Sequence, residues 1–227
     1  MTASSPKAPP PLQLRLALDR PPSYARADFV ASTSNAAAVS AIDAWPRWPG
    51  GRLVLVGPEG SGKTHLARAW AGKVGAVIAP HEVPERRQAV LLEDADRAID
   101  DATLFHLINM ADTGATLMLT ARTEPSVWPA RLADLRSRLN ALMVARIEAP
   151  DDVVLTGVMR KLFRESNIKP GDEVLAYLIK RIERSIPAVR DVVRRIDALA
   201  DAEGREVTRT LARQILECGD KTLDLFE

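Results

Sequence analysis

Apolar and polar residues follow two different periods along the first 150 residues of the chain. Short apolar runs typical of buried strands occur at RLVLVG (52–57), AVLLED (89–94) and ATLMLTA (115–121), with weaker ones at AVIAP (76–80) and VARIEA (144–149). Between them, helical spacing predicts helices near 36–45, 63–74, 101–113 and 129–142. Strands that alternate with helices pair in parallel through crossover connections. We therefore expect an α/β core with a parallel sheet over residues 20–150.

The pattern changes after Pro150, where each apolar stretch has helical spacing. The stretches cover 153–166, 171–184, 187–204 and 207–217, and breakers separate them near Pro170, Pro187 and Gly204. They predict a small all-helical domain over residues 151–218, followed by a short tail over 219–227.

The N-terminal segment differs from both regions. Residues 1–19 form an arm whose prolines disfavour both helix and sheet. The arm ends in PLQLRLAL (11–18), in which leucines alternate with other residues as they do in a strand. This stretch is either the first strand of the fold or a strand lent to a partner. The core already contains enough predicted strands, which favours the second interpretation.

Charge and cysteine content narrow the classes of function. The chain of 227 residues has 31 Lys+Arg against 30 Asp+Glu, so no global basic field favours nucleic acid or an anionic membrane. The single cysteine, Cys218, excludes an internal disulfide. The N-terminal residues lack the apolar stretch of a signal peptide or membrane span. We expect a cytoplasmic protein with no membrane partner.

The segment GPEGSGKT (57–64) matches the phosphate-binding loop G-x-x-x-x-G-K-[ST] in full, between a predicted strand and a predicted helix. Such a loop turns its backbone N–H groups toward phosphate oxygens, its lysine approaches the β- and γ-phosphates, and its last hydroxyl reaches Mg²⁺. The motif predicts that the chain binds ADP or ATP together with Mg²⁺. The expected contacts are Gly57, Pro58, Gly60, Ser61, Gly62, Lys63, Thr64 and His65, with Thr64 on the metal.

Acidic residues follow the predicted strand at 89–92. A nucleotide hydrolase of this kind needs an acid on a neighbouring strand for the Mg²⁺ shell and a second one that polarises water. Glu93 is the candidate for the metal and Asp94 the candidate for catalysis, with Asp96 nearby. The usual order in such motifs is Asp first, followed by Asp or Glu. The side chain of Glu93 is therefore one methylene longer than that of the usual metal ligand, and that of Asp94 is one methylene shorter than that of a Glu that polarises water. Nucleotide binding is therefore better supported than fast hydrolysis, and the acids can alternatively cap the following helix.

With these motifs in this order, residues 12–217 resemble the AAA+ family, and within it the DnaA branch. The resemblance implies that Arg138 in LRSRL is an arginine finger that points at the nucleotide of a neighbouring subunit, with Arg136 as its backup. It also implies that Arg190 in AVRDVV contacts the chain's own nucleotide, whereas Arg194 and Arg195 one turn later face solvent. Phe29 and Val30 match the segment that binds adenine in this family.

The chain departs from the DnaA branch in three places. Thr120 matches a polar sensor position, but Arg122 stands two residues later where an Asp is usual, which weakens autonomous catalysis. About 30 residues separate Lys63 from Glu93, too few for the elements with which DnaA builds a helical filament. Only CGDKTLDLFE follows the last predicted helix, so we expect no direct sequence-specific DNA binding.

The resemblance also implies protein partners. Regulatory members of this branch act on DnaA while tethered to the DNA polymerase III β sliding clamp by a peptide Q-L-x-L-x-L. QLRLAL matches it at Gln13, Leu14, Leu16 and Leu18. These side chains suit a groove that takes an extended peptide, with the amide in a polar subpocket. TLDLF (222–226) is a weaker second candidate, and a homodimer stays open.

Three hypotheses follow. The first is a nucleotide-bound, clamp-tethered negative regulator of replication initiation, associated with the replisome, that activates the ATPase of DnaA through Arg138 and is a weak ATPase itself. The second is an autonomous AAA+ ATPase of the helicase-loader type. The third is an adaptor for which nucleotide is irrelevant.

Overall fold

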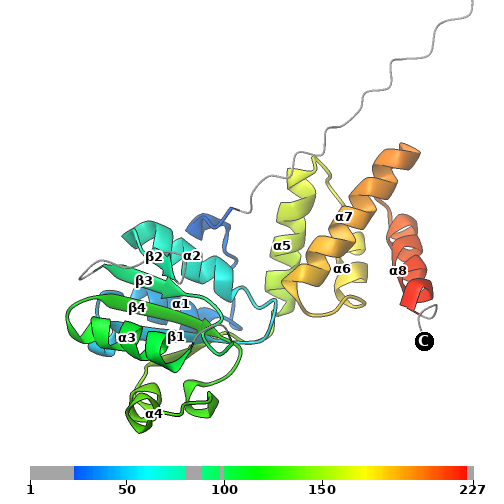
Figure 1. Ribbon diagram of the computed structural model, residues 1–227. Helices are drawn as coiled ribbons and strands as arrows, with labels where there is room; N and C mark the ends of the chain where they lie inside the picture. Colours follow the sequence, from blue (N-terminus) through cyan, green and yellow to red (C-terminus); the bar gives the residue numbers. More distant parts are fainter. Residues whose placement is uncertain (1–22, 80–87, 98–99, 224–227) are drawn as a thin grey trace, which may run out of the picture.

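Five parallel strands form a single sheet in the order β2-β3-β4-β1-β5 (Figure 1). The protein is represented by a computed structural model, which describes residues 23–79, 88–97 and 100–223. The strands are β1 (Arg52–Val56), β2 (Val77–Ala79), β3 (Ala89–Leu92), β4 (Thr116–Ala121) and β5 (Val144–Arg146). The α/β class with a parallel sheet, predicted from the alternating pattern, is confirmed.

Helices cover both faces of the sheet. Two of them, α1 (Ala36–Asp43) and α2 (Lys63–Val74), pack on one face, and α3 (Asp101–Asp112) and α4 (Ala133–Asn140) pack on the other. Short 3-10 turns lie at η1 (Arg26–Asp28), η2 (Pro49–Gly51) and η3 (Pro125–Val127).

The pleat of β1 explains why this strand is apolar after Arg52. Successive side chains of a strand point to opposite faces. Leu53 and Leu55 pack among residues of α1 and α2, whereas Val54 and Val56 pack among residues of α3 and α4. A central strand covered on both faces therefore needs a continuous apolar run.

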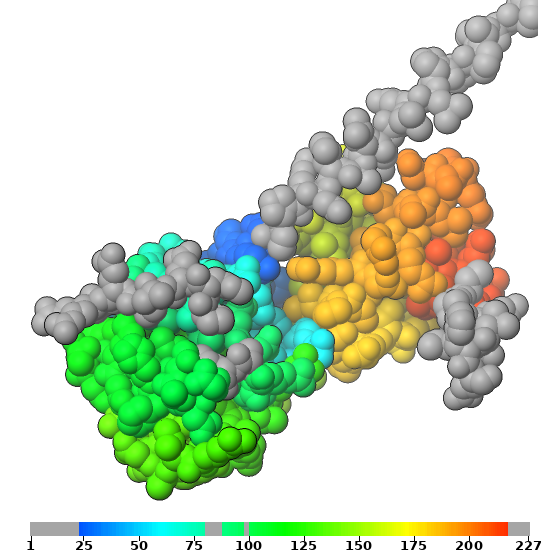
Figure 2. Space-filling view, in the orientation of Figure 1, coloured from blue at the N-terminus to red at the C-terminus, as the bar shows by residue number. Residues whose placement is uncertain are grey.

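The remaining helices form a second, separate cluster, which we call the lid: α5 (Asp152–Glu165), α6 (Asp172–Ile179), α7 (Ile186–Glu203) and α8 (Arg209–Leu223). Their apolar faces converge on fully buried residues such as Leu155, Met159 and Phe163. Figures 1 and 2 show the lid, coloured yellow to red, beside the core. The helical pattern after Pro150 is confirmed as four helices.

Two details of the prediction are corrected by the structure. Helix α8 runs to Leu223, past residue 218 where the helical part was expected to end. The break predicted near Pro187 is confirmed, since α7 begins at Ile186 and Pro187 lies in its first turn, where proline is tolerated. Arg195 does not face solvent freely, because its guanidinium donates to the carbonyl of Ile215 at 2.5 Å and ties α7 to α8.

The two segments predicted to bind the sliding clamp lie wholly or partly outside the residues that the structure describes. Residues 13–18 of the clamp peptide lie outside the described residues, as do residues 224–226 of the second candidate. Among the helices that are described, none combines the length and the apolar character that a membrane crossing requires.

Candidate functional site

The phosphate-binding loop joins the carboxyl end of β1 to the start of α2. The Gly57 N–H donates to the carbonyl of Ala121 at the end of β4, at 3.2 Å. Gly62 has a positive φ of 100° and precedes the first residue of α2, whose N-terminal N–H groups are not capped by a side chain in the described part of the chain. A helix N-terminus of this kind is an anion site.

Lys63 is buried and turned back into the loop. Its Nζ donates to the carbonyls of Gly57 at 2.7 Å and Pro58 at 2.8 Å. Burial lowers the pKa of Lys63, and the negative charge of Asp94 opposes this effect. A buried cation paired only with neutral carbonyls gains from an anionic partner. The Ser61 hydroxyl is also buried, and it has no hydrogen-bond partner among the described residues. Both observations fit a bound phosphate group.

The two neighbouring acids after β3 lie in different environments. Glu93 accepts from Nε and Nη2 of Arg68 at 2.9 and 2.6 Å. Asp94 is exposed and is the largest of the charges that act on Lys63. Its backbone has a positive φ of 50°, and its N–H donates to Oγ1 of the buried Thr120. Of the two carboxylates, Asp94 is therefore the one that acts on the phosphate loop.

Within the part of the chain that the structure describes, no three His, Cys, Asp or Glu side chains form a metal cluster. Mg²⁺ in nucleotide sites is held by one or two protein oxygens together with phosphates and water, so an all-protein cage is not needed. The hydroxyl of Thr64 and the carboxylate of Glu93 stay the predicted metal contacts, and Asp94 stays the predicted catalytic acid. Thr64 is exposed, on the second residue of α2.

Arg122 connects the loop to the acidic turn. Its guanidinium forms an ion pair with Glu59 of the phosphate loop, and its N–H donates to Asp96 at 2.9 Å. Its charge adds to the lowering of the Lys63 pKa. The unusual residue of the sequence analysis thus lies beside the phosphate loop and within electrostatic reach of Lys63.

The lid touches the phosphate loop directly. The N–H of Ile186, the first residue of α7, donates to the carbonyl of Gly60 at 3.1 Å. Gly60 has a positive φ of 71°, and a Cβ there would lie 2.7 Å from Cδ of Pro187. Glycine is therefore required at this position both for the backbone conformation and for the contact with the lid.

Phe29 and Val30 join the N-terminal segment to the same site. The ring of Phe29 lies over Gly62, 3.3 Å from the position a Cβ would take there, and Val30 packs at 2.9 Å from the corresponding position of Gly157 in α5. The imidazole of His65 lies between the rings of Tyr24 and Phe29, at 5.8 and 5.6 Å between centroids.

His65 lies within electrostatic reach of Arg190. Burial lowers the pKa of His65, and the charge of Arg190 adds a smaller lowering. Arg190 is exposed, and among the described residues it has no hydrogen bond or ion pair. Phe29 thus lies over Gly62, His65 is the third residue of α2, and Arg190 lies one turn after Ile186, which contacts Gly60. The contacts of all three with a nucleotide stay predictions.

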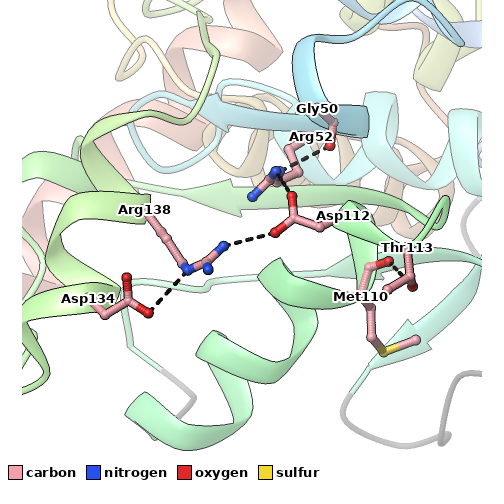
Figure 3. Close-up of polar contacts among 7 residues, drawn as sticks. All are labelled: Gly50, Arg52, Met110, Asp112, Thr113, Asp134 and Arg138. Carbon is pink, nitrogen blue, oxygen red and sulfur yellow. Dashed lines mark hydrogen bonds and ion pairs between the residues drawn. The ribbon is translucent and has the colours of Figure 1, made fainter.

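Arg138 lies at the other end of the sheet. Its Nη1 contacts Oδ2 of Asp112 at 2.8 Å, and the other oxygen of Asp112 is paired with Arg52 (Figure 3). Arg52 is the first residue of β1 and the phosphate loop follows the last, a separation of about 13 Å at the usual rise per residue. Arg136, predicted as its backup, donates to the carbonyls of Ser126 and Trp128 and so fixes the η3–α4 connection.

Three of these residues were missed by the sequence analysis: Arg68, Asp112 and Arg52. Arg68 carries a readable signal, since it lies four residues after Thr64 and so on the same side of α2. Asp112 and Arg52 carry none, because their contacts join residues 26 and 60 positions apart.

The chain is similar to DnaA in sequence. It is 23% identical to the chromosomal replication initiator protein DnaA of Geobacter sulfurreducens over 231 residues, which cover 86% of this chain and 52% of that protein. It is 26% identical to an uncharacterised protein of Haemophilus influenzae, over 70% of this chain and 79% of the relative. The chain thus spans about half the length of the DnaA proteins it matches. No family model matches it.

Solved structures show the same fold. Domain III of the Thermotoga maritima replication initiation protein DnaA superposes with a TM-score of 0.72 at 20% identity, covering 87% of this chain and 97% of that one. A replication initiator DnaA bound to AMPPCP and single-stranded DNA has a TM-score of 0.66 at 18% identity, covering 89% and 71%. The chain therefore has an AAA+ fold, as predicted, and is related to DnaA in sequence.

Proposed function

We propose that this chain is a regulator of replication initiation of the Hda type, which binds ADP or ATP with Mg²⁺ and stimulates ATP hydrolysis by DnaA. The single observation that carries the proposal is the division of charges between the two ends of the sheet. The phosphate loop, Arg122 and Arg190 lie toward one end, and Arg138 lies at the other. An arginine placed there is suited to a phosphate held by a second protein.

At the chain's own nucleotide, the loop N–H groups and Lys63 would hold the phosphates, and Thr64 and Glu93 would hold Mg²⁺. When bound, the metal ion neutralises charge on the phosphate oxygens. Arg190 is free among the described residues to pair with a phosphate, and Phe29, whose ring lies over Gly62, would contact the base. Because Ile186 already contacts Gly60, bound nucleotide would be enclosed between core and lid.

At the second site, Arg138 would complete the nucleotide pocket of DnaA. Its guanidinium cannot be deprotonated and offers several N–H donors, so it stabilises charge that develops on the transferring phosphoryl group. An arginine supplied in trans accelerates such reactions by about 10³ to 10⁵. The Q-L-x-L-x-L peptide at Gln13 to Leu18 would bind the DNA-loaded sliding clamp and bring Arg138 to DnaA.

The test is ATP hydrolysis by ATP-loaded DnaA in the presence of clamp, DNA and this protein. Arg138→Ala is expected to abolish the stimulation. Arg131→Ala is the matched control. Arg131 is exposed and lies two residues before α4, and its substitution removes the same charge. Undiminished stimulation by Arg138→Ala would exclude the proposal.

The clamp peptide has a separate test. A protein with Gln13→Ala and Leu16→Ala is expected to lose binding to immobilised clamp while it keeps nucleotide binding. Retention of clamp binding would assign the interaction to another segment, the first candidate being residues 222–226.

The second hypothesis, an autonomous ATPase of the helicase-loader type, needs Asp94 as its catalytic acid. Steady turnover by the purified protein alone, abolished by Asp94→Ala, would support it. Full regulatory activity of a Lys63→Ala protein would instead support the adaptor.

A further inference from the structure

Asp112, the last residue of α3, bridges two arginines at the end of the sheet opposite the phosphate loop. Figure 3 shows its carboxylate between Arg52 and Arg138, with one oxygen directed to each. The three residues come from α3, β1 and α4, so the cluster is formed only in the folded protein. Because Asp112 pairs with the predicted arginine finger, it affects whether the guanidinium of Arg138 is available to a phosphate.

The contacts of Arg138 hold its guanidinium in one orientation. Besides Nη1 on Asp112, its Nε lies 3.5 Å from Oδ2 of Asp134, one turn earlier in α4. Its Cζ lies 5.3 Å from the ring centre of Phe105 in α3. About a third of the side chain stays exposed, so a phosphate of a second molecule can approach it. Nη1, however, is already bonded to a carboxylate.

Arg52 lowers the free-energy cost of moving Arg138 from Asp112 to a phosphate. Its side chain is only 16% exposed, and its Nε donates to the carbonyl of Gly50 at 3.0 Å, so it stays in place. If Arg138 turns away from Asp112, the carboxylate keeps its ion pair with Arg52. No buried charge loses its only partner, which is the step that makes breaking an ion pair costly.

We propose that Asp112 is a regulatory positioning residue that competes for Arg138 with the triphosphate held by the partner protein. In the free protein Asp112 occupies the guanidinium, and Arg52 retains Asp112 when the phosphate takes its place. Arg138 thereby responds to the strong negative charge of a triphosphate and is withheld from weaker anions. The inference rests on the proposed function, because it concerns the same arginine.

The expected effect follows from the exposure of the pair. A partly exposed ion pair contributes about 0.2–1 kcal/mol. Removing the competing charge should therefore lower the concentration of this protein needed for half-maximal stimulation of DnaA by about 1.4- to fivefold. The maximal rate should not change, since Asp112 leaves Arg138 before the phosphate is bound.

Asp112→Asn is the test, measured as half-maximal concentration and maximal rate of ATP hydrolysis by ATP-loaded DnaA with clamp and DNA. The amide oxygen can still accept from Arg138, so the orientation is kept while the charge is removed. Asp134→Asn is the matched control, because Asp134 is 65% exposed and its contact with Arg138 is longer; it should change the half-maximal concentration less than Asp112→Asn.

Arg52→Gln provides an independent second variant with the opposite sign. Without Arg52, the carboxylate of Asp112 has Arg138 as its remaining partner in the cluster, so the half-maximal concentration should rise. In an Asp112→Asn background the same Arg52→Gln change should have no further effect. Urea unfolding of each variant shows whether it is folded. If Asp112→Asn does not fold, a folded Arg52→Gln protein still tests the competition between Asp112 and the phosphate.

The outcomes separate this inference from the proposed function. If Arg138→Ala stimulates as well as the unchanged protein, both are wrong. If Arg138→Ala is inactive while Asp112→Asn needs an equal or higher concentration, or lowers the maximal rate, the proposed function stands and the competition by Asp112 is refuted.

Discussion

The contact between the lid and the phosphate loop at Gly60 should contribute measurably to the free energy of unfolding. Gly60 has a φ of +71°, and a Cβ there would lie 2.7 Å from Cδ of Pro187 and 2.9 Å from Cβ of Ser185. Gly60→Ala therefore adds a backbone penalty and a clash with the start of α7. It also strains the bond from the Ile186 N–H to the Gly60 carbonyl.

Gly75→Ala isolates the backbone penalty. Gly75, at the end of α2, has a similar φ of +69°, but nothing lies within 4 Å of a Cβ at this position. The left-handed conformation costs an L residue about 1–2 kcal/mol. The clash at Gly60 adds about 1–3 kcal/mol if the lid stays docked, and loss of the Ile186 bond adds about 0.5–1.5 kcal/mol if it moves away.

We therefore expect Gly60→Ala to lower the free energy of unfolding by about 1–2 kcal/mol more than Gly75→Ala. For a chain of this size the difference corresponds to about 2–8 °C in Tm. Urea and thermal unfolding measure it, and hydrogen exchange of the Ile186 amide should accelerate only in Gly60→Ala. Equal destabilisation by the two variants, with unchanged exchange at Ile186, would show that the lid is not held at Gly60.

Three further predictions concern charges. Glu59→Gln frees Arg122 from its ion pair and removes a negative charge from the phosphate loop, so ATP should bind about two- to fivefold more tightly by calorimetry; unchanged affinity would contradict this role. Burial lowers the pKa of His65, so the unfolded chain takes up its proton first and stability should fall as pH drops below about 6.5, a slope in urea midpoints that His65→Gln should lack. Burial of Asp151 raises its pKa, but hydrogen bonds, the first from the Val154 N–H, outweigh this and lower it, so its stabilisation should disappear as acid protonates it. Asp151→Ala should cost about 0.5–2 kcal/mol at pH 7 and less in acid.

Much of the fold could be predicted because it depends on local periodicity. Residues 53–56 are apolar because β1 is covered on both faces, and α2 begins and ends where the sequence indicates, at Lys63 and Val74. The end of α8 was missed because the helix continues through CGDKTL, where apolar spacing is weak. The phosphate loop was readable because its chemistry requires a contiguous motif.

The partners of the site's charged residues could not be predicted in the same way. Glu93 is predicted at the metal, and the structure adds an ion pair with Arg68, 25 residues away in sequence, that no sequence pattern indicated. Arg195 was expected in solvent, but it binds a carbonyl of a different helix. A long charged side chain reaches any of several partners, and only packing decides which one is near. Sequence patterns therefore identify the chemistry available at a site better than they identify its pairing.

The direction of the strands explains how one small core separates the phosphate loop from the proposed arginine finger. All strands are parallel, so the loops after their carboxyl ends collect the phosphate loop, the acidic turn and Thr120 at one edge, where the lid can cover them. The opposite edge holds Arg52, Asp112 and Arg138, with no lid residue among the contacts of Arg138. The strand β1 begins at Arg52 and leads directly into Gly57, so the two edges are joined by one central strand that pairs with β4 along its length and with β5 over its last three residues. This separation is what the proposed function requires, with one nucleotide bound in cis at the phosphate-loop edge and a second, held by a partner, at the Arg138 edge.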